Sequence, residues 1–222
     1  MEIVLFTYDR PHWKTERFIH ELASLQLLPT WVVAAPWKNL TLPPAAVTTV
    51  THLPRHPAEL SQRYGIEYVV RAHEEWDTDS GLGIIGGGRI IPADTISKFS
   101  VGILNMHPGL IPLNRGLSNV CRAIRDGMPQ AITAHLIDSR VDAGRILLSQ
   151  TVPTGPTDTI YDVGERMMDT QVAMLGPAIR LAGLAGSIPP LPDGVGGYEL
   201  PLSKAEEERL IEVWSSRCRS TQ

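Results

Sequence analysis

Short runs of aliphatic and β-branched residues recur along the chain and predict the strands of a parallel sheet. Residues 3–7 and 31–35 are continuous apolar runs, which are typical of strands buried on both faces of a sheet. Between them, apolar residues over 18–26 recur with helical spacing and predict an amphipathic helix. The order of these three segments indicates a βαβ unit.

Three further apolar runs extend this pattern through the middle of the chain, at residues 68–70, 82–85 and 101–104. The segments between them are too long for hairpins, which favours crossover connections and parallel strands. Residues 57–63 and 92–98 are expected to form short crossover helices. Ser118 is the expected N-cap of a helix over 119–126, which Gly127 can end in the left-handed conformation.

The later part of the chain is expected to add two strands and a long helix. Residues 131–136 and 146–152 are rich in aliphatic and β-branched side chains, and they flank a polar loop at 138–144. An apolar stripe over 158–184 predicts a final packing helix, which Pro177 is expected to kink. Together these elements predict the α/β class, with a mostly parallel, twisted sheet flanked by helices.

A change in composition predicts the domain organisation. Residues 1–185 carry the strand and helix pattern, whereas 186–222 begin with a turn-rich Pro/Gly linker and contain a charged helix near 205–214. That helix carries an apolar stripe, made of Leu210, Ile211 and Trp214. Such a stripe suits either packing on the core or a homodimer contact. We therefore expect one main domain followed by a linker and a C-terminal helix.

Composition and charge narrow the classes of partner. The chain has 222 residues, of which 43% are hydrophobic and 20% charged, as is typical of soluble globular proteins. Its formal net charge of -4 argues against a nucleic-acid surface and favours small-molecule substrates. The N-terminus resembles neither a signal peptide nor a membrane anchor, and Cys121 and Cys218 suit two free thiols. A cytoplasmic location without membrane contact is expected.

Asn105, His107 and Asp142 are the candidate catalytic residues. Asn105 and His107 follow a predicted strand and are two residues apart, so their side chains can point to the same side. An amide and an imidazolium can stabilise a developing oxyanion, and the carboxylate of Asp142 can raise the pKa of an imidazole and relay protons. Because no Gly-x-Ser-x-Gly motif supplies a nucleophile, direct attack by a substrate amine is favoured. His135 is expected to be a satisfied histidine near this site.

Two other chemistries suit these segments less well. Residues 81–86 match the glycine pattern of dinucleotide-binding folds, but 82–85 is itself a predicted strand and no helix can open directly after it. His107, His135 and Asp142 are suitable metal ligands, but no compact ligand pair lies on one helix, so no metal is expected. The glycines at 86–88 would let a flat ligand approach the backbone.

Five motifs give the chain a resemblance to a known family. They are Gly87-Gly88-Arg89-Ile90-Ile91-Pro92, Asn105-Met106-His107-Pro108-Gly109-Leu110-Ile111-Pro112, Arg115-Gly116, Thr133-Ala134-His135 and Asp142-Ala143-Gly144-Arg145-Ile146-Leu147. In these motifs, over roughly residues 80–184, the chain resembles the folate-dependent formyltransferases. This family includes glycinamide ribonucleotide, methionyl-tRNA and sugar-nucleotide N-formyltransferases.

The resemblance implies a Rossmann-like fold, catalysis by residues 1–185 and 10-formyltetrahydrofolate as formyl donor. Asn105 and protonated His107 would stabilise the oxyanion formed when an amine attacks the formyl carbon, and Asp142 would support His107 and assist proton transfer. The residues implied for the folate pocket are Gly88, Arg89, Ile90, Ile91, Ile137, Asp138 and Val141.

The acceptor is expected to be the amino group of a nucleotide-linked sugar. The segment after the first strand, Tyr8 to Trp13, departs from the phosphate loop of the purine-pathway members, and the tail does not resemble the extra domain of the methionyl-tRNA enzymes. Candidate acceptor contacts are Tyr8, Arg10, Trp13, Pro108, Gly109 and Arg115. By residue type, several of them suit a base or a phosphate, and they equally suit ordinary surface or packing positions.

Other functions remain open at this point. The acceptor can be another small amine, including glycinamide ribonucleotide, and water in its place would make the protein a 10-formyltetrahydrofolate hydrolase. A non-catalytic folate-binding module would keep the pocket without the catalytic residues, whereas Asn105, His107 and Asp142 are all present. A dehydrogenase would have to bind a nicotinamide.

Overall fold

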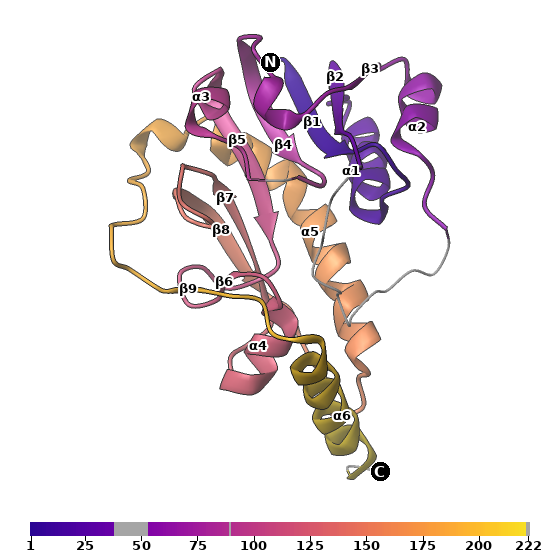
Figure 1. The fold of residues 1–222 in the computed structure, drawn as a ribbon, viewed down its shortest axis with the longest axis vertical. Coiled ribbons are helices and arrows are strands. Elements are labelled where there is room, and N and C mark those ends of the chain that lie inside the picture. The colour runs from indigo at the N-terminus through magenta and orange to yellow at the C-terminus, as the bar shows by residue number, and fades with distance from the viewer. Residues whose placement is uncertain (38–52, 89, 221–222) are drawn as a thin grey trace.

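Seven strands form one central sheet in the order β3-β2-β1-β4-β5-β7-β8 (Figure 1). Their bounds are Ile3–Tyr8 (β1), Trp31–Ala35 (β2), Glu67–Val70 (β3), Ser80–Ile85 (β4), Phe99–His107 (β5), Ala131–Leu136 (β7) and Arg145–Thr151 (β8). The computed structural model describes residues 1–37, 53–88 and 90–220. Strands β1 to β5 pair in parallel, and β7 pairs antiparallel with both β5 and β8. The prediction of a mostly parallel sheet flanked by helices is confirmed.

Helices cover both faces of this sheet. The helices are Trp13–Ser24 (α1), Pro57–Tyr64 (α2), Ala93–Ile96 (α3), Asn119–Asp126 (α4), Ile160–Ala182 (α5) and Lys204–Ser220 (α6), with single 3₁₀ turns at His73–Glu75 (η1) and Ala185–Ser187 (η2). A separate two-stranded sheet joins Arg115–Gly116 (β6) to Tyr198–Glu199 (β9). This small sheet was not predicted.

Alternating side chains of β1 pack into two separate cores, one on each face of the sheet. Ile3 and Leu5 point into a large core shared with α1 and α5, whereas Val4 and Phe6 point into a smaller core that contains Trp76. This alternation follows from the two-residue period of a strand. Because a strand covered on both faces buries every side chain, the run reads as continuously apolar in the sequence.

Two helix starts differ from the prediction. Helix α1 begins at Trp13 rather than at Phe18, because its polar first turn includes Thr15 and Glu16, which are buried and carry no apolar signal. Ser118 is the N-cap residue of α4, as predicted, but its side chain does not cap the helix. Its backbone is left-handed (φ 58°), its hydroxyl makes no capping hydrogen bond, and that hydroxyl instead accepts one from the Leu202 amide at 3.2 Å.

Other helix ends agree with the sequence pattern. Gly127 ends α4 in the left-handed conformation (φ 64°), as predicted. Helix α5 is continuous across Pro177 and begins with a capping box in which Thr159 and Asp162 satisfy each other's backbone amides.

The C-terminal helix folds back on the domain. Helix α6 lies against α4 and α5 at the lower end of Figure 1, and the Trp214 indole donates a hydrogen bond to the Asp158 carbonyl at 2.6 Å. The structure therefore shows the core-packing alternative for the apolar stripe of α6. The homodimer and the domain boundary at residue 185 stay predictions.

Cys121 is a buried free thiol. Burial and the charge of the nearby Glu207 raise the pKa of this thiol to about 11. Within the described residues, every helix is too short or too polar to cross a membrane.

Candidate active site

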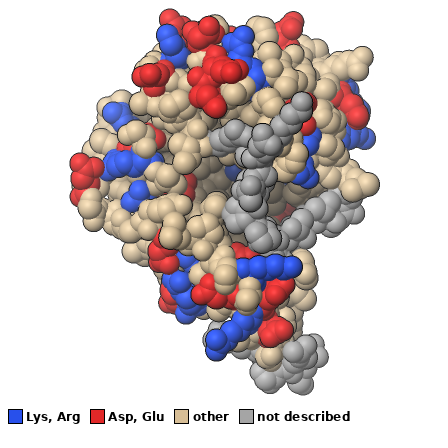
Figure 2. Space-filling view, viewed as in Figure 1, with Lys and Arg blue, Asp and Glu red and all other residues tan. Residues whose placement is uncertain are grey.

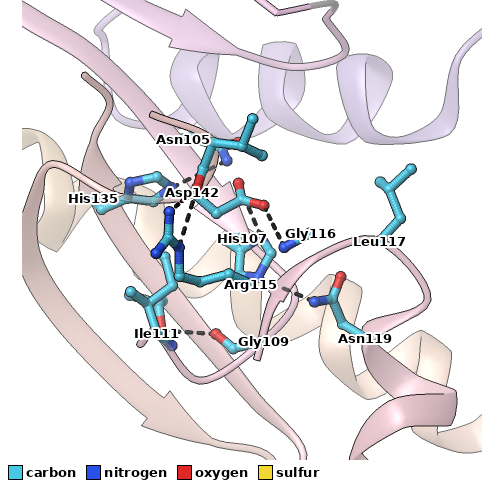
Figure 3. A network of polar contacts seen from close by, with 12 residues as sticks. Asn105, His107, Gly109, Ile111, Arg115, Gly116, Leu117, Asn119, His135 and Asp142 are labelled. Atoms are coloured by element: carbon cyan, nitrogen blue, oxygen red, sulfur yellow. Dashed lines mark hydrogen bonds and ion pairs between the residues drawn. The ribbon is translucent and has the colours of Figure 1, made fainter. Parts of the chain in front are cut away.

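Strand β5 presents Asn105 and His107 on one face of the sheet edge (Figure 3). The strand runs to His107, beyond the predicted end, whereas β4 stops at Ile85 opposite Asn105. Met106 lies between the two and is fully buried in the core, as strand alternation requires. The carboxyl end of β5 therefore holds an amide and an imidazole side by side where a parallel neighbour is missing.

The His107 ring is held at both nitrogens. Its Nε2 lies 2.7 Å from the Asn114 carbonyl oxygen and its Nδ1 lies 3.3 Å from Asp142 Oδ1. A carbonyl and an ionised carboxylate can only accept, so both contacts are satisfied together when each ring nitrogen carries a proton. The Asn119 amide nitrogen also lies 3.2 Å from Nε2 and bonds to the Asn114 carbonyl. The arrangement suits an imidazolium facing a carboxylate.

Asp142 occupies an uncommon backbone conformation. It lies in the loop between β7 and β8 with φ 45°, a left-handed region that non-glycine residues rarely adopt. Its Oδ2 accepts a hydrogen bond from the Gly116 amide at 2.8 Å. Burial acts to raise the pKa of Asp142, but the His107 hydrogen bond and charge and the Gly116 amide outweigh it and hold that pKa below the usual value. Asp142 is therefore a carboxylate at neutral pH.

His135 orients the Asn105 amide from behind. Its Nδ1 lies 2.6 Å from the Ala143 carbonyl, which can only accept, so this nitrogen carries the proton. Its Nε2 then accepts from Asn105 Nδ2 at 3.2 Å. Burial, helped by the charge of His107, lowers the pKa of His135 to about 4, so the ring is neutral. The prediction of a satisfied histidine beside the site is confirmed.

Lys14 approaches the same strand from α1. Its Nζ donates to the Met106 carbonyl at 2.9 Å, between the two residues that β5 presents. Burial lowers the pKa of Lys14 to about 8, although the charge of Asp142 opposes this shift. A cation thus lies behind the candidate oxyanion donors and within electrostatic reach of Asp142.

The residues predicted for a folate pocket separate into buried and exposed groups. Ile91 is buried in the smaller core, where Ile137 packs against it, whereas Ile90 is 77% exposed. Gly88 accepts a hydrogen bond from the Tyr8 hydroxyl at 2.7 Å. Arg89 lies outside the described residues.

The 138–144 loop contributes the rest of that group. Asp138 is paired with Arg140 at 2.5 Å, and the Val141 carbonyl accepts from the Arg115 guanidinium at 2.7 Å. Ile137 and Asp138 also line a cavity of about 610 Å³ between β5, this loop and the end of α5.

The candidate acceptor residues fall into two places. Tyr8, Arg10 and Trp13 surround the start of α1, where the Arg10 guanidinium lies 3.9 Å from the centre of the Trp37 ring. Gly109 lies beside His107, and a Cβ there would come within 2.5 Å of the Asn114 carbonyl oxygen and 2.8 Å of His107 Nε2. A side chain at this position would therefore displace the His107 imidazole.

Pro108 and Arg115 complete the predicted acceptor set. Pro108 is half-buried between His107 and Gly109. The Arg115 guanidinium donates to backbone carbonyls, two bonds to Val141 and one to Gly196. In this structure the Arg115 side chain therefore links the segments around Val141 and Gly196.

Gly86 and Gly87 lie against the start of α1. A Cβ on Gly87 would lie 2.7 Å from the His12 ring, and one on Gly86 would lie 3.1 Å from the Thr15 hydroxyl. Gly86 and Gly87 thus let the start of α1 approach β4, whereas the approach of a flat ligand to Gly88 stays a prediction. No helix opens directly after β4, which also removes the context for dinucleotide binding.

Sequence reasoning missed Lys14, Asn114 and Asn119. Asn114 and Asn119 are buried and bond to one another, and the Asn114 carbonyl accepts from His107. Their proximity to the His-Pro-Gly motif was the available signal, since both follow it closely in the sequence. Lys14 offered no signal, because its contact depends on how α1 meets β5.

The surface around the site has mixed charge. Figure 2 shows a hollow on the face seen in Figure 1, and the described residues along its border are largely uncharged. Acidic and basic side chains are interspersed below it, over α4 and α6. On this face no broad patch of basic residues is visible among the described residues.

Comparison with known proteins agrees with this geometry. Residues 84–179, which include Asn105, His107 and Asp142, match the family described as formyl transferase. A methionyl-tRNA formyltransferase from Acidiphilium cryptum (strain JF-5) is 38% identical over 135 residues, which cover 60% of this chain and 43% of that protein. The chain spans about half the length of the curated relatives it matches.

Solved structures share the fold over nearly the whole chain. A 4-N formyltransferase from Francisella tularensis matches 98% of this chain and 87% of its own with a TM-score of 0.66 and 16% identity. The formyltransferase PseJ from Anoxybacillus kamchatkensis matches 97% of both chains with a TM-score of 0.58 and 20% identity. Residues 84–179 therefore match the formyl transferase family, and the chain as a whole shares the fold of these solved formyltransferases.

Proposed function

We propose that the protein transfers the formyl group of 10-formyltetrahydrofolate to a primary amine. The observation that carries this proposal is the pairing of Asn105 with His135 and of His107 with Asp142 at the end of β5. The unprotonated amine attacks the formyl carbon and forms a C–N bond. The bond from that carbon to N10 then breaks, and the proton lost by the amine passes to the leaving nitrogen, so that tetrahydrofolate and the formamide are the products.

Two donors face the developing oxyanion. One N–H of Asn105 Nδ2 donates a hydrogen bond to His135. The second N–H remains free to stabilise negative charge on the formyl oxygen. The His107 Nδ1 proton is held only by the longer 3.3 Å contact with Asp142 and serves as the second donor. Asp142 balances the charge of the imidazolium and accepts the amine proton on its way to N10.

The donor site is proposed on the α3 side of β5. Ile137 supplies an apolar surface for the pteridine and is supported by the core that contains the buried Ile91, and Gly88 and Val141 supply backbone groups near it. Arg89, Ile90 and Asp138 are proposed at its outer rim. A flat, partly polar ring suits such a pocket, because apolar side chains contact its faces while backbone groups form hydrogen bonds with its edge.

The proposed acceptor is the amino group of a nucleotide-linked sugar. PseJ, which matches this chain over 97% of both lengths, is described in complex with UDP-4,6-dideoxy-4-formamido-L-AltNAc and tetrahydrofolate. In this chain the exposed Arg10, stacked on Trp37, offers a cation for a diphosphate and an aromatic surface for a base.

A second candidate acceptor is methionyl-tRNA. It is favoured by the sequence relatives that carry that activity in their names. Against it stand the net charge of -4 and the mixed charges around the hollow, since tRNA binding draws on basic surface. Glycinamide ribonucleotide and water are the remaining alternatives.

A product-mass assay distinguishes these acceptors. Purified protein with 10-formyltetrahydrofolate is offered nucleotide-linked amino sugars, glycinamide ribonucleotide and methionyl-tRNA in separate reactions, with His107→Ala as the inactive control. A gain of one formyl group on a sugar amine alone supports the proposal. Formylation of only one of the other two amines reassigns the acceptor, and formate release without any acceptor indicates a hydrolase.

A further inference from the structure

Arg122 is a buried cation that no step of the proposed reaction uses. It lies on α4, is 1% exposed, and is among the largest fully buried side chains. A guanidinium taken out of water is strongly destabilising unless it finds hydrogen-bond acceptors. Burial lowers the pKa of Arg122, and the Glu199 carboxylate opposes that shift. Its partners therefore show what the side chain does in this fold.

The partners of Arg122 lie in the segment that reaches the active site. Its Nη2 donates to the carbonyls of Arg115 and Leu117, the former at 2.6 Å. Its Nη1 lies 3.9 Å from Glu199 Oε2. One planar guanidinium thus holds both ends of residues 115–117, hereafter the 115–117 loop, and faces a carboxylate from the C-terminal part of the chain.

The 115–117 loop in turn fixes Asp142. The Gly116 amide donates to Asp142 Oδ2 at 2.8 Å, and the Arg115 guanidinium donates twice to the carbonyl of the preceding residue, Val141. Figure 3 shows these contacts converging beside His107. Because Asp142 has a left-handed backbone (φ 45°), it persists only where surrounding contacts over-determine it. These contacts supply that constraint.

Residues 196–202, hereafter the C-terminal strap, close over the 115–117 loop. Strand β9 pairs with β6, the Gly196 carbonyl accepts from Arg115 at 3.1 Å, and the Leu202 amide donates to Ser118 at 3.2 Å. Glu199 also pairs with Arg125 at 2.8 Å. The fit is close, since a Cβ on Gly116 would lie 2.6 Å from the Glu199 carbonyl oxygen.

We propose that Arg122 and Glu199 are positioning residues for formyl transfer, which together with the C-terminal strap hold Asp142 against His107 through the 115–117 loop. This inference rests on the proposed function. Neither side chain touches the reacting atoms, and both act by fixing the carboxylate. The C-terminal part of the chain thereby becomes part of the transfer site, although the residues matched by the family end at 179.

The test compares Arg122→Lys and Glu199→Gln with Glu208→Gln as a matched control. Lysine keeps the charge at 122 but cannot bridge two carbonyls and a carboxylate, because it lacks the planar fork. Glu208 is an exposed carboxylate of α6, and its ion pair is with Lys204 of the same helix. Thermal unfolding, kcat and the KM for the folate donor are measured for each variant.

A positioning role predicts a separation of kcat from KM and from stability. Arg122→Lys is expected to lower kcat by about tenfold to a hundredfold, since small misplacement of a catalytic group costs that much. Glu199→Gln is expected to lower kcat severalfold, with Tm and donor KM close to those of Glu208→Gln. If both Arg122→Lys and Glu199→Gln fold and match the control in kcat, the inference is overturned. Should Arg122→Lys fail to fold, Glu199→Gln decides alone.

A measurement without substrate separates this inference from the proposed function. The ¹⁵N signals of the His107 ring report the proximity of Asp142, and Asp142→Asn provides the reference for its loss. If the signals of Glu199→Gln move toward those of Asp142→Asn, the positioning role of Glu199 is supported, even where no acceptor has been found. If the signals are unchanged in both Arg122→Lys and Glu199→Gln, the positioning role is overturned. Formyl transfer by the wild-type protein is not affected by that result.

Discussion

His135 lies directly behind Asn105 and accepts a hydrogen bond from its amide nitrogen at 3.2 Å. The other ring nitrogen of His135 is fixed by the Ala143 carbonyl, so the neutral ring can only accept from Asn105. The Asn105 oxygen and nitrogen are thereby distinguished, and a donor is left facing the site. A buried histidine thus fixes the orientation of a side-chain amide in the adjacent strand.

The neutral His135 predicts a loss of stability in mild acid. Its pKa is about 4 in the folded protein against a usual value of 6.5, so the unfolded chain binds the extra proton between these values. Stability is therefore complete above pH 6.5 and falls by up to about 3 kcal/mol as pH drops toward 4. His12, whose pKa burial also lowers to about 4, adds to the same trend.

Chemical unfolding from pH 7 to pH 4 checks this expectation. His135→Gln is expected to be less stable at pH 7 but to show a shallower decline, because one of the two histidines with a lowered pKa no longer titrates. A decline as steep as that of the wild type would contradict a neutral, buried His135.

Removing either oxyanion donor is expected to abolish most activity without unfolding the protein. Asn105→Ala and His107→Ala should each lower kcat by on the order of 10²–10³, the cost of one lost oxyanion donor. Steady-state formyl transfer and circular dichroism measure the two effects. Wild-type turnover in either folded variant is incompatible with the proposed mechanism.

Gly109→Ala tests whether the His-Pro-Gly turn is required for the placement of His107. Its new Cβ would collide with the Asn114 carbonyl and with His107 Nε2, so kcat should fall by about tenfold or more. Gly186→Ala is the control, since a Cβ at Gly186 meets no described atom within 4 Å. Equal activity of the two variants would show that the turn tolerates a side chain.

Lys14 predicts a basic limb in the pH dependence of kcat. Because burial lowers its pKa to about 8, the ammonium behind Met106 loses its proton as pH rises through that value, and positive charge near the oxyanion is lost. Activity should fall above pH 8. Lys14→Met is expected to have lower activity without this inflection, whereas Lys98→Met, which alters an exposed pair with Asp79, should keep it. An unchanged inflection in Lys14→Met would assign it to another group.

Much of the fold could be predicted because strands buried on both faces carry an unambiguous apolar signal. Residues 3–7, 31–35 and 131–136 are of this kind, and each lies in an observed strand. The start of α1 was placed too late because buried Thr15 and Glu16 look like surface residues. The β6 and β9 pair is two residues long on each side, too short for any periodicity to reveal.

The site was partly predictable for a related reason. Asn105 and His107 belong to one strand, so local alternation brings their side chains together. Asp142 joins them through a loop, and its partner Gly116 contributes a backbone amide that residue type does not signal. The roles of Lys14, Arg122 and Glu199 depend on how separate elements meet, which the sequence of each element does not contain.

Transfer of a labelled formyl group tests the central claim most directly. The protein is given 10-[¹³C]formyltetrahydrofolate and a nucleotide-linked amino sugar, and the label is followed by NMR. The account predicts that the label appears as a formamide on the sugar amine as tetrahydrofolate is released, and that His107→Ala transfers almost none. Label recovered only as formate, or left on the folate with every amine tested, would contradict it.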